Sequence, residues 1–298
     1  GVGAQAGVSV HDQLAGSTVS FRNNLVITGS NRGSNGNGIN LSNNLAGSLF
    51  NIEGSASVDG TDLAAIAIAS NAGTVQFNGS TRITRRQQEG ILVTNSSGRV
   101  SFGNALADIT TVLNDDTTAS QFAAISLTGN SGAISVLNSS IGNAQGGAAG
   151  GAGVNVVNNT GAVNFGAMVV DSFNGIGLFG LNNASISVGD GVIDSTGAAA
   201  VDIEQTGVNI NLASVTRTDS PNYGIRLVET NKDGFRTFAV DPRIANPVPG
   251  DGGQIAGAKG DGLDNDDAAG VFLSNAGQVR LQAMQLQDNE FGIRIRNT

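Results

Sequence analysis

The sequence has no cysteine, no tryptophan, one tyrosine and only four prolines among its 298 residues. The lack of cysteine excludes disulfides, thiolate metal sites and a cysteine nucleophile. Lysine is also scarce, because Lys232 and Lys259 are the only two, and residues 121–200 contain neither lysine nor arginine. Nucleic-acid binding needs clustered basic side chains that neutralise phosphates, so the composition argues against nucleic acid as a partner.

Long apolar runs are missing as well. No stretch approaches the ~20 apolar residues of a membrane span, so we expect no membrane span in this segment. Residues 1–10 lack the charged start and apolar centre of a signal peptide, and the first residue is not Met. We therefore expect the chain to be a segment of a longer protein.

Glycine and aliphatic residues are abundant. The chain contains 44 glycines, and 39% of its residues are hydrophobic although only 4% are aromatic. The core must therefore consist mainly of aliphatic side chains and Phe, and the many Val and Ile residues favour β-strands. Charged residues make up only 13% of the chain, which argues against charge-rich disorder, and the net charge is −9.

Two octets far apart in the chain are nearly identical. "SNAGTVQF" occupies residues 70–77, and "SNAGQVRL" occupies residues 274–281. Weaker copies lie between them and on either side, each led by an apolar–x–apolar pair, and most pairs are 22–29 residues apart. The pairs are Val8/Val10, Ile39/Leu41, Ile66/Ile68, Ile91/Val93, Ile125/Leu127, Val154/Val156, Ile176/Leu178, Val201/Ile203, Ile225/Leu227, Val271/Leu273 and Ile293/Ile295.

Each unit has the pattern of three short strands. The first apolar pair is followed by a second apolar pair and then by a looser apolar group. Turns such as "SNAG" and "VNNTG" lie between the first pair and the second pair. Asn and Gly tolerate the left-handed backbone of tight turns. Units this small must stack to bury a core. The sequence therefore predicts a single all-β domain over residues 1–298, a right-handed parallel β-helix (solenoid) of about eleven three-strand coils.

Three other repeat architectures fit less well. Leucine-rich repeats have a similar unit length, but their return segment would not carry the two further strand signals present here. A left-handed β-helix would show a six-residue rhythm. A propeller blade needs four antiparallel strands over ~40 residues.

Equivalent residues of neighbouring coils are expected to stack. Phe77, Phe102 and Phe165 hold the same place in their units, and Phe21 is expected to begin this column. The sequence also aligns Val136, Val188, Leu212 and Leu281 with it. The residues between the apolar positions of the second strand should face outward, and they are neutral and polar: Gln76, Ser101, Ser135, Asn164, Ser187 and Asn211.

The repeat is interrupted in three places, and interruptions of a solenoid are where function usually resides. They are residues 103–124, residues 142–153 and, longest, an insertion loop at 229–270 that carries three of the four prolines. Its acidic run, "GDGLDNDDAAG" at 260–270, contains Asp261, Asp264, Asp266 and Asp267. Ca²⁺ prefers several oxygen ligands on a flexible loop, so these four residues are the candidate metal ligands. The alternative is a solvated acidic loop, because the spacing of an EF-hand is not present.

Basic residues cluster in "TRITRRQQEG". Arg82, Arg85 and Arg86 form a candidate ligand-binding site for an anionic polysaccharide. The alternative is a solvated turn in which these arginines pair in part with Glu89.

The three-strand coil with asparagine-containing turns resembles the pectin-lyase-like superfamily of right-handed β-helices. That resemblance covers nearly the whole chain and implies one of two functions. The enzymatic branches would need catalytic motifs, but Asp266–Asp267 and Arg294–Ile295–Arg296 match the polygalacturonase-like pattern only in part. A pectate-lyase-like site needs a basic residue beside bound Ca²⁺. Arg226 and Arg280 lie on coils near the acidic loop and could take that role, but the sequence contains no arginine motif of that family.

The chain is closer in character to the passenger rods of bacterial adhesins and autotransporters. We therefore expect a non-catalytic β-helical rod of a secreted or surface-displayed bacterial protein. Its expected location is extracellular or at the cell surface, and its expected partners are a host or environmental surface, a polysaccharide, or further β-helical coils at its ends. The alternative is a polysaccharide lyase or glycoside hydrolase that acts in a groove beside the long loops.

Overall fold

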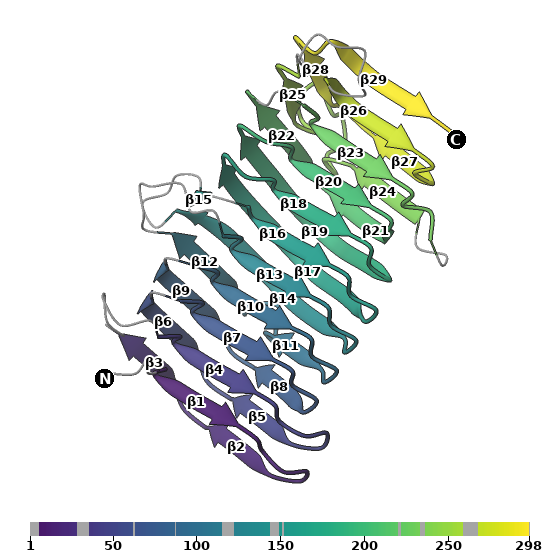
Figure 1. Cartoon of the computed structure of the whole chain (residues 1–298). Helices are drawn as coiled ribbons and strands as arrows, with labels where there is room; N and C mark the ends of the chain where they lie inside the picture. The colour runs from purple at the N-terminus through teal and green to yellow at the C-terminus, as the bar shows by residue number, and fades with distance from the viewer. Residues whose placement is uncertain are drawn as a thin grey trace.

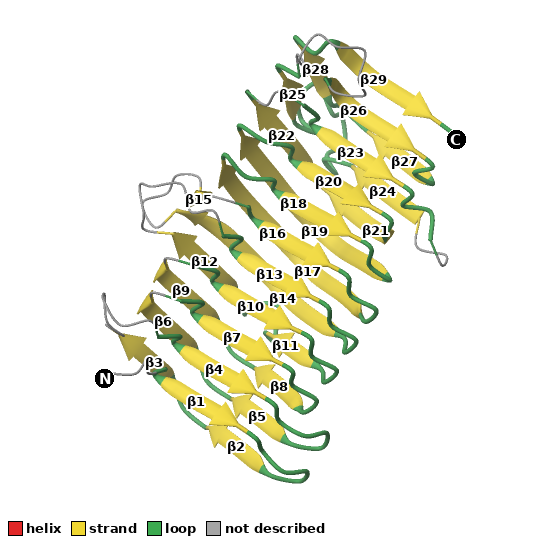
Figure 2. Ribbon diagram, in the orientation of Figure 1, coloured by secondary structure: helices red, strands yellow, loops and turns green. Residues whose placement is uncertain are grey.

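The repeating apolar pairs fold into short strands that wind around a common axis (Figure 1). The structure is a computed structural model that describes residues 6–28, 36–61, 63–86, 88–114, 122–143, 149–150, 152–219, 222–232, 236–258 and 268–297. All regular elements in these ranges are strands, and their pairing is parallel (Figure 2). None of the described residues belongs to a helix that could span a membrane. The predicted right-handed parallel β-solenoid is confirmed.

The first strands of the coils form one sheet of eleven strands. Val8 pairs with Ile39, Ile39 with Ile66 and Ile66 with Ile91, so the predicted apolar pairs stack directly on one another. The strands are β1 (Val8–His11), β4 (Ile39–Ser42), β7 (Ile66–Ala69), β10 (Ile91–Thr94), β13 (Ile125–Thr128), β16 (Val154–Val157), β18 (Leu178–Leu181), β20 (Val201–Glu204), β23 (Ile225–Val228), β26 (Ala269–Ser274) and β29 (Phe291–Arg296).

The second and third strands of the coils belong to an eighteen-stranded sheet on the far side of the core. The second strands are β2 (Thr18–Phe21), β5 (Leu49–Ile52), β8 (Thr74–Phe77), β11 (Val100–Phe102), β21 (Gly207–Leu212), β24 (Arg236–Val240) and β27 (Gln278–Leu281). The third strands are β3 (Leu25–Thr28), β6 (Ala56–Thr61), β9 (Thr81–Arg86), β12 (Thr110–Asn114), β15 (Ala149–Gly150), β22 (Ser214–Thr218), β25 (Gln254–Ala256) and β28 (Gln285–Gln287). Three long strands continue through both positions: β14 (Ile134–Asn143), β17 (Ala162–Phe173) and β19 (Ser185–Thr196).

The number of turns is slightly lower than predicted. The solenoid has about nine turns, whereas the repeat predicts about eleven coils. Eleven strands do stack in the first sheet, but the last of them, β29, opens a coil that the described residues do not close.

The predicted aromatic column lies inside the solenoid. Phe77 pairs with Phe102, and their rings stack with centroids 4.7 Å apart and planes inclined by 14°. The column continues through Val136, Phe165 and Val188. Toward the N-terminus it reaches Phe21 through Ile52, as predicted.

Two of the predicted column members occupy a different place. Val188 pairs with Ile210, which pairs with Phe238, so the column runs through these residues and on to Val279. Leu212 and Leu281 lie one inward position further along their strands. The prediction assumes a fixed number of residues between the first and second strands of each unit. The number of turn residues varies, however, and the backbone pairing sets the register.

A similar shift affects one first strand. Leu178 pairs with Val154, so Leu178 and Gly180, rather than Ile176 and Leu178, occupy the two inward places. Gly180 has no apolar side chain, so the apolar–x–apolar pattern does not identify it as an inward position. A Cβ at that position would lie 2.8 Å from Cδ1 of Ile186, so the neighbouring side chain fills the space that Gly180 leaves.

The asparagines of the turns have two separate roles. The first turn residue has a positive φ, as in Asn95 (φ 49°), Asn158 (φ 55°) and Asn182 (φ 51°). The next residue points inward and is buried, and it forms a ladder along the axis: Asn44, Asn71, Ser96, Asn130, Asn159, Asn183, Thr206 and Thr230. In this ladder Oδ1 of Asn159 accepts the backbone N–H of Asn130 at 2.9 Å, and Oδ1 of Asn183 accepts that of Asn159 at 3.0 Å. The ladder therefore satisfies turn N–H groups that the strands cannot reach.

Candidate functional site

The four predicted calcium ligands lie outside the described residues. Asp261, Asp264, Asp266 and Asp267 fall within residues 259–267, between the buried Ala258 and Ala268. In the part of the chain that the structure describes, no three His, Asp or Glu side chains lie close enough together to hold a metal ion. The calcium site therefore stays a prediction.

The predicted arginine site is described only in part. Arg82 lies on the outward face of β9, where it pairs with Ser57 and Thr111 of the neighbouring coils, and its side chain is exposed. The side chains of Arg85 and Arg86 fall outside the description. Arg82 thus has a solvent-facing position, and the site as a whole stays a prediction.

The long interruption at 229–270 contains two strands of the solenoid. β24 pairs with β21 and β27, and β25 pairs with β22 and β28. Within this segment, residues 241–253 form an extended corner that we call the 241–253 loop. Arg243 of this loop extends past the coil of β20, β21 and β22 to the coil that contains β19. There it donates to the carbonyl oxygen of Gly189 at 2.9 Å and pairs with Asp190 at 3.1 Å.

A groove runs along the outward face of the second strands. It has a volume of about 590 Å³ and crosses five coils, from β8 to β19. We call it the second-strand groove. Its lining includes the outward residues that the sequence predicted to be neutral and polar: Gln76, Ser101, Ser135, Asn164 and Ser187. These residues repeat at the strand spacing of ~4.8 Å, so the groove is about 19 Å long.

Glycines at one corner of the coils help to form the groove. Gly166 and Gly189 both line it, and neither has room for a side chain. A Cβ at Gly166 would meet the carbonyl oxygen of Leu137, and one at Gly189 would lie 2.7 Å from the carbonyl oxygen of Gly166. The surface is therefore flat at these two glycines, because any residue with a side chain would protrude there.

The groove begins at Gln76 and Asn78 on the β8 coil and ends at Gly189, whose carbonyl oxygen is bound by Arg243. Gly103 and Asn104 line it on the next coil, where Oδ2 of Asp108 accepts the backbone N–H groups of Asn104 and Ala105 at 3.0 and 2.8 Å. Among the lining residues that the structure describes, only Arg99 carries a charge, and it is exposed. The groove is therefore long, straight and nearly neutral.

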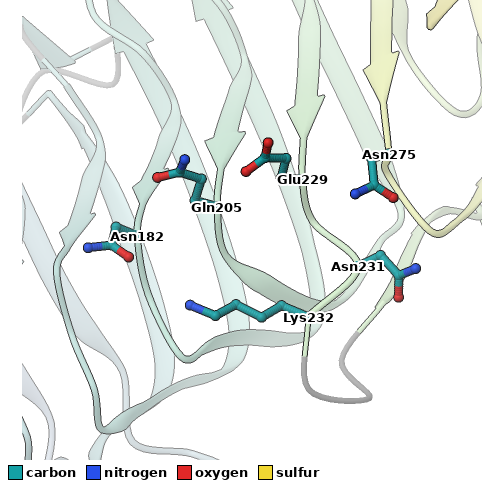
Figure 3. Close-up of a pocket in the computed structure, with 6 residues that line it drawn as sticks. All are labelled: Asn182, Gln205, Glu229, Asn231, Lys232 and Asn275. Atoms are coloured by element: carbon teal, nitrogen blue, oxygen red, sulfur yellow. The ribbon is translucent and has the colours of Figure 1, made fainter. Parts of the chain in front are cut away.

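A second hollow lies at the turns after the first strands (Figure 3). Its volume is about 350 Å³, and we call it the turn hollow. Asn182, Gln205, Glu229 and Asn275 line it from four successive coils, each with a φ of 49–51°. Asn231 and Lys232 also line it, and Nζ of Lys232 lies 3.5 Å from the carbonyl oxygen of Asn183. The hollow is polar, open to solvent, and carries one charge of each sign.

Neither arginine that a lyase might use as a base is free to accept a proton. Arg226 donates to Asp202 at 2.9 Å and to Glu204 at 2.7 Å. Burial lowers the pKa of Arg226, but the bonds to these two carboxylates outweigh it and leave the pKa above its usual value. Arg280 lies 3.3 Å from Asp241 and donates to Gln282. Both side chains therefore act as charged partners of other residues.

Two carboxylates face outward side by side on the third strands. Asp171 of β17 is the register partner of Asp194 of β19, so their backbones are about 4.8 Å apart. Burial raises the pKa of Asp171, and the nearby charge of Asp194 raises it further. Burial also raises the pKa of Asp194. The two residues are 23 positions apart in the sequence, so the sequence alone does not reveal them as a pair.

Sequence reasoning identified the wall of the second-strand groove but not the groove itself. The alternation of polar and apolar residues predicted which side chains face outward. The flat corner at Gly166 and Gly189 could have been found only from the register between coils. A comparison of the chain with protein-family models, curated proteins and solved structures gave no match.

Proposed function

We propose that the chain is a non-catalytic rod of a secreted or surface-displayed bacterial protein, related in architecture to pectin-lyase-like adhesin passengers. The second-strand groove supports this proposal most directly. Five coils present neutral polar side chains along a straight path, and such a surface suits contact with a long polymer or a surface more than it suits bond cleavage.

The internal ladder supports the rod function as well. Oδ1 of Asn159 is also bound by Nδ2 of Asn130 at 2.8 Å, so one side chain links two coils through two bonds. Because such links recur along the axis, each coil is held at a fixed angle to the next. A stiff rod can hold a binding surface at a distance from its attachment point.

The experiment separates binding from turnover. The purified protein is incubated with insoluble neutral and acidic polysaccharides, and both the bound protein and the released sugar are measured. We expect the protein to sediment with at least one polysaccharide while no new reducing ends or unsaturated products form. Sustained product release would refute the non-catalytic function.

A lyase or hydrolase remains the second candidate, and the pair of Asp171 and Asp194 favours it. Retaining glycosidases hold two carboxyl groups about 5–5.5 Å apart, and one of them has a raised pKa so that it can donate a proton. If product release is observed, the variants Asp171→Asn and Asp194→Asn should each abolish it. Activity that survives both changes would exclude this pair as the catalytic acids.

A further inference from the structure

The second-strand groove is the feature of the described structure that carries an inference about a ligand. We propose that it binds an extended, uncharged, β-linked hexose polymer along the solenoid axis, with about one sugar ring per coil. This proposal rests on the proposed function and specifies the class of ligand that the rod would bind.

The shape of the groove selects an extended ligand. Ser101, Ser135, Asn164 and Ser187 are consecutive register partners, so their side chains form a straight row at the strand spacing. A β-1,4-linked hexose chain is a flat ribbon whose rings repeat at a distance close to this spacing. An α-1,4-linked chain coils and would leave the row after one or two rings.

The chemistry of the lining selects sugar hydroxyls. Serine hydroxyls and the amides of Gln76, Asn78 and Asn164 both donate and accept hydrogen bonds, as sugar hydroxyls do. Asn164 is exposed, and none of the described residues forms a hydrogen bond with its side chain. Leu137 is half-buried beside this row and provides an apolar contact for the C–H face of a ring.

The charge of the lining disfavours an acidic polymer. A chain with one carboxylate per ring would place several negative charges in the groove, and Arg99 is the only described lining residue that could pair with one of them. The remaining carboxylates would lose solvation without a partner. A neutral chain has no such cost.

Binding is tested by isothermal titration of the full chain with three hexasaccharides: cellohexaose, maltohexaose and an oligogalacturonate. We expect cellohexaose to bind and the other two not to bind. Increasing the NaCl concentration from 0.05 to 0.5 M should leave the affinity for cellohexaose unchanged within about two-fold, because no ion pair is involved. Preferred binding of the oligogalacturonate, with weakening in salt or in Arg99→Ala, would overturn the inference but leave the rod function intact.

Variants locate the site. Asn164→Ala removes one exposed hydrogen-bonding group and should weaken cellohexaose binding about three- to ten-fold. Ser135→Tyr fills the middle of the groove and should abolish binding. The controls are Thr111→Ala and Thr111→Tyr, both on the outward face of a third strand. Cellohexaose binding that is equal in Ser135→Tyr and Thr111→Tyr, with both variants folded, would show that the groove is not the site.

Discussion

Nδ2 of Asn130 donates to Oδ1 of Asn159 at 2.8 Å, and the same oxygen accepts the backbone N–H of Asn130 at 2.9 Å. Nδ2 of Asn159 in turn donates to the carbonyl oxygen of Leu127 at 2.9 Å. The buried amide of Asn159 therefore satisfies two donors and one acceptor of the preceding coil. Removing it leaves several polar groups without a partner and without water.

Asn159→Ala should lower the free energy of unfolding by about 2–4 kcal/mol, because each buried polar group left unpaired costs about 1–3 kcal/mol. The measurement is chemical denaturation followed by circular dichroism. Asn209→Ala, which truncates an exposed amide on β21, is the matched control and should change stability by less than about 0.5 kcal/mol. Equal effects in the two variants would mean that the ladder does not stabilise the fold.

Phe102→Ala should destabilise the protein by about 3–5 kcal/mol through the cavity left between Phe77 and Val136. Phe102 is 1% exposed, whereas Leu106, four residues later, is 86% exposed. Leu106→Ala is therefore the control and should have almost no effect on the denaturation midpoint. A loss below about 1 kcal/mol in Phe102→Ala would contradict the stacked column.

Asp171→Asn should stabilise the protein at neutral pH but not at low pH. The pKa of Asp171 is raised in the folded state, so the folded state holds its proton more strongly than the unfolded chain does. The stability contributed by this group is present below the unfolded pKa of about 3.9 and is lost as the pH rises through the folded pKa. Thermal midpoints at pH 3 and pH 7 measure the difference, with Glu229→Gln as a control at an exposed carboxylate. A stabilising effect that is the same at both pH values would rule out this explanation.

Arg217→Met should leave stability unchanged or increase it. The Arg217 side chain is fully buried and donates from Nη1 to the carbonyl oxygen of Ala256 at 2.6 Å, whereas none of the described residues forms a hydrogen bond with its Nε or Nη2. Burial lowers its pKa to about 10, and the charge of Asp219 opposes that shift only in part. Replacing a poorly paired buried charge by an apolar side chain of similar length is often neutral or stabilising. A loss of more than about 2 kcal/mol in thermal denaturation would show that Arg217 has a partner that stabilises it.

Calcium binding by the acidic run is tested by titration calorimetry with CaCl₂. If Asp261, Asp264, Asp266 and Asp267 hold the ion, the double variant Asp264→Ala/Asp266→Ala should bind at least ten-fold more weakly than the native chain. Removal of calcium by a chelator should then lower the thermal midpoint of the native chain only. The same heat of binding in both proteins would assign it to another site.

The sequence predicts the fold of this protein well, because each strand repeats a local pattern. Val75 and Phe77, or Val100 and Phe102, identify an inward face without any knowledge of the neighbouring coil. Register is harder to predict, since the distance from Ile203 to Val208 or from Leu227 to Phe238 depends on the length of the intervening turn. For this reason the sequence pattern assigns Leu212 and Leu281 to the wrong column.

The candidate sites depend on register even more strongly. Asp171 and Asp194 become neighbours only because the length of one coil separates them along the chain, and Gly166 and Gly189 form a flat corner for the same reason. Local pattern does identify the outward polar residues such as Ser135 and Asn164. It cannot show that Arg243, 54 residues from Gly189, binds the carbonyl oxygen of this groove residue.

The contact of Arg243 with Gly189 and Asp190 also changes how the solenoid should unfold. In a stack where each coil touches only its nearest neighbours, unfolding proceeds by fraying from the ends, one coil at a time. Arg243 joins a coil to the next but one, so opening the coil of β20, β21 and β22 between them also breaks this exposed ion pair. Such a pair contributes about 0–1 kcal/mol, so it should slow the exchange of the backbone amide protons from β18 to β25 by about five-fold at most.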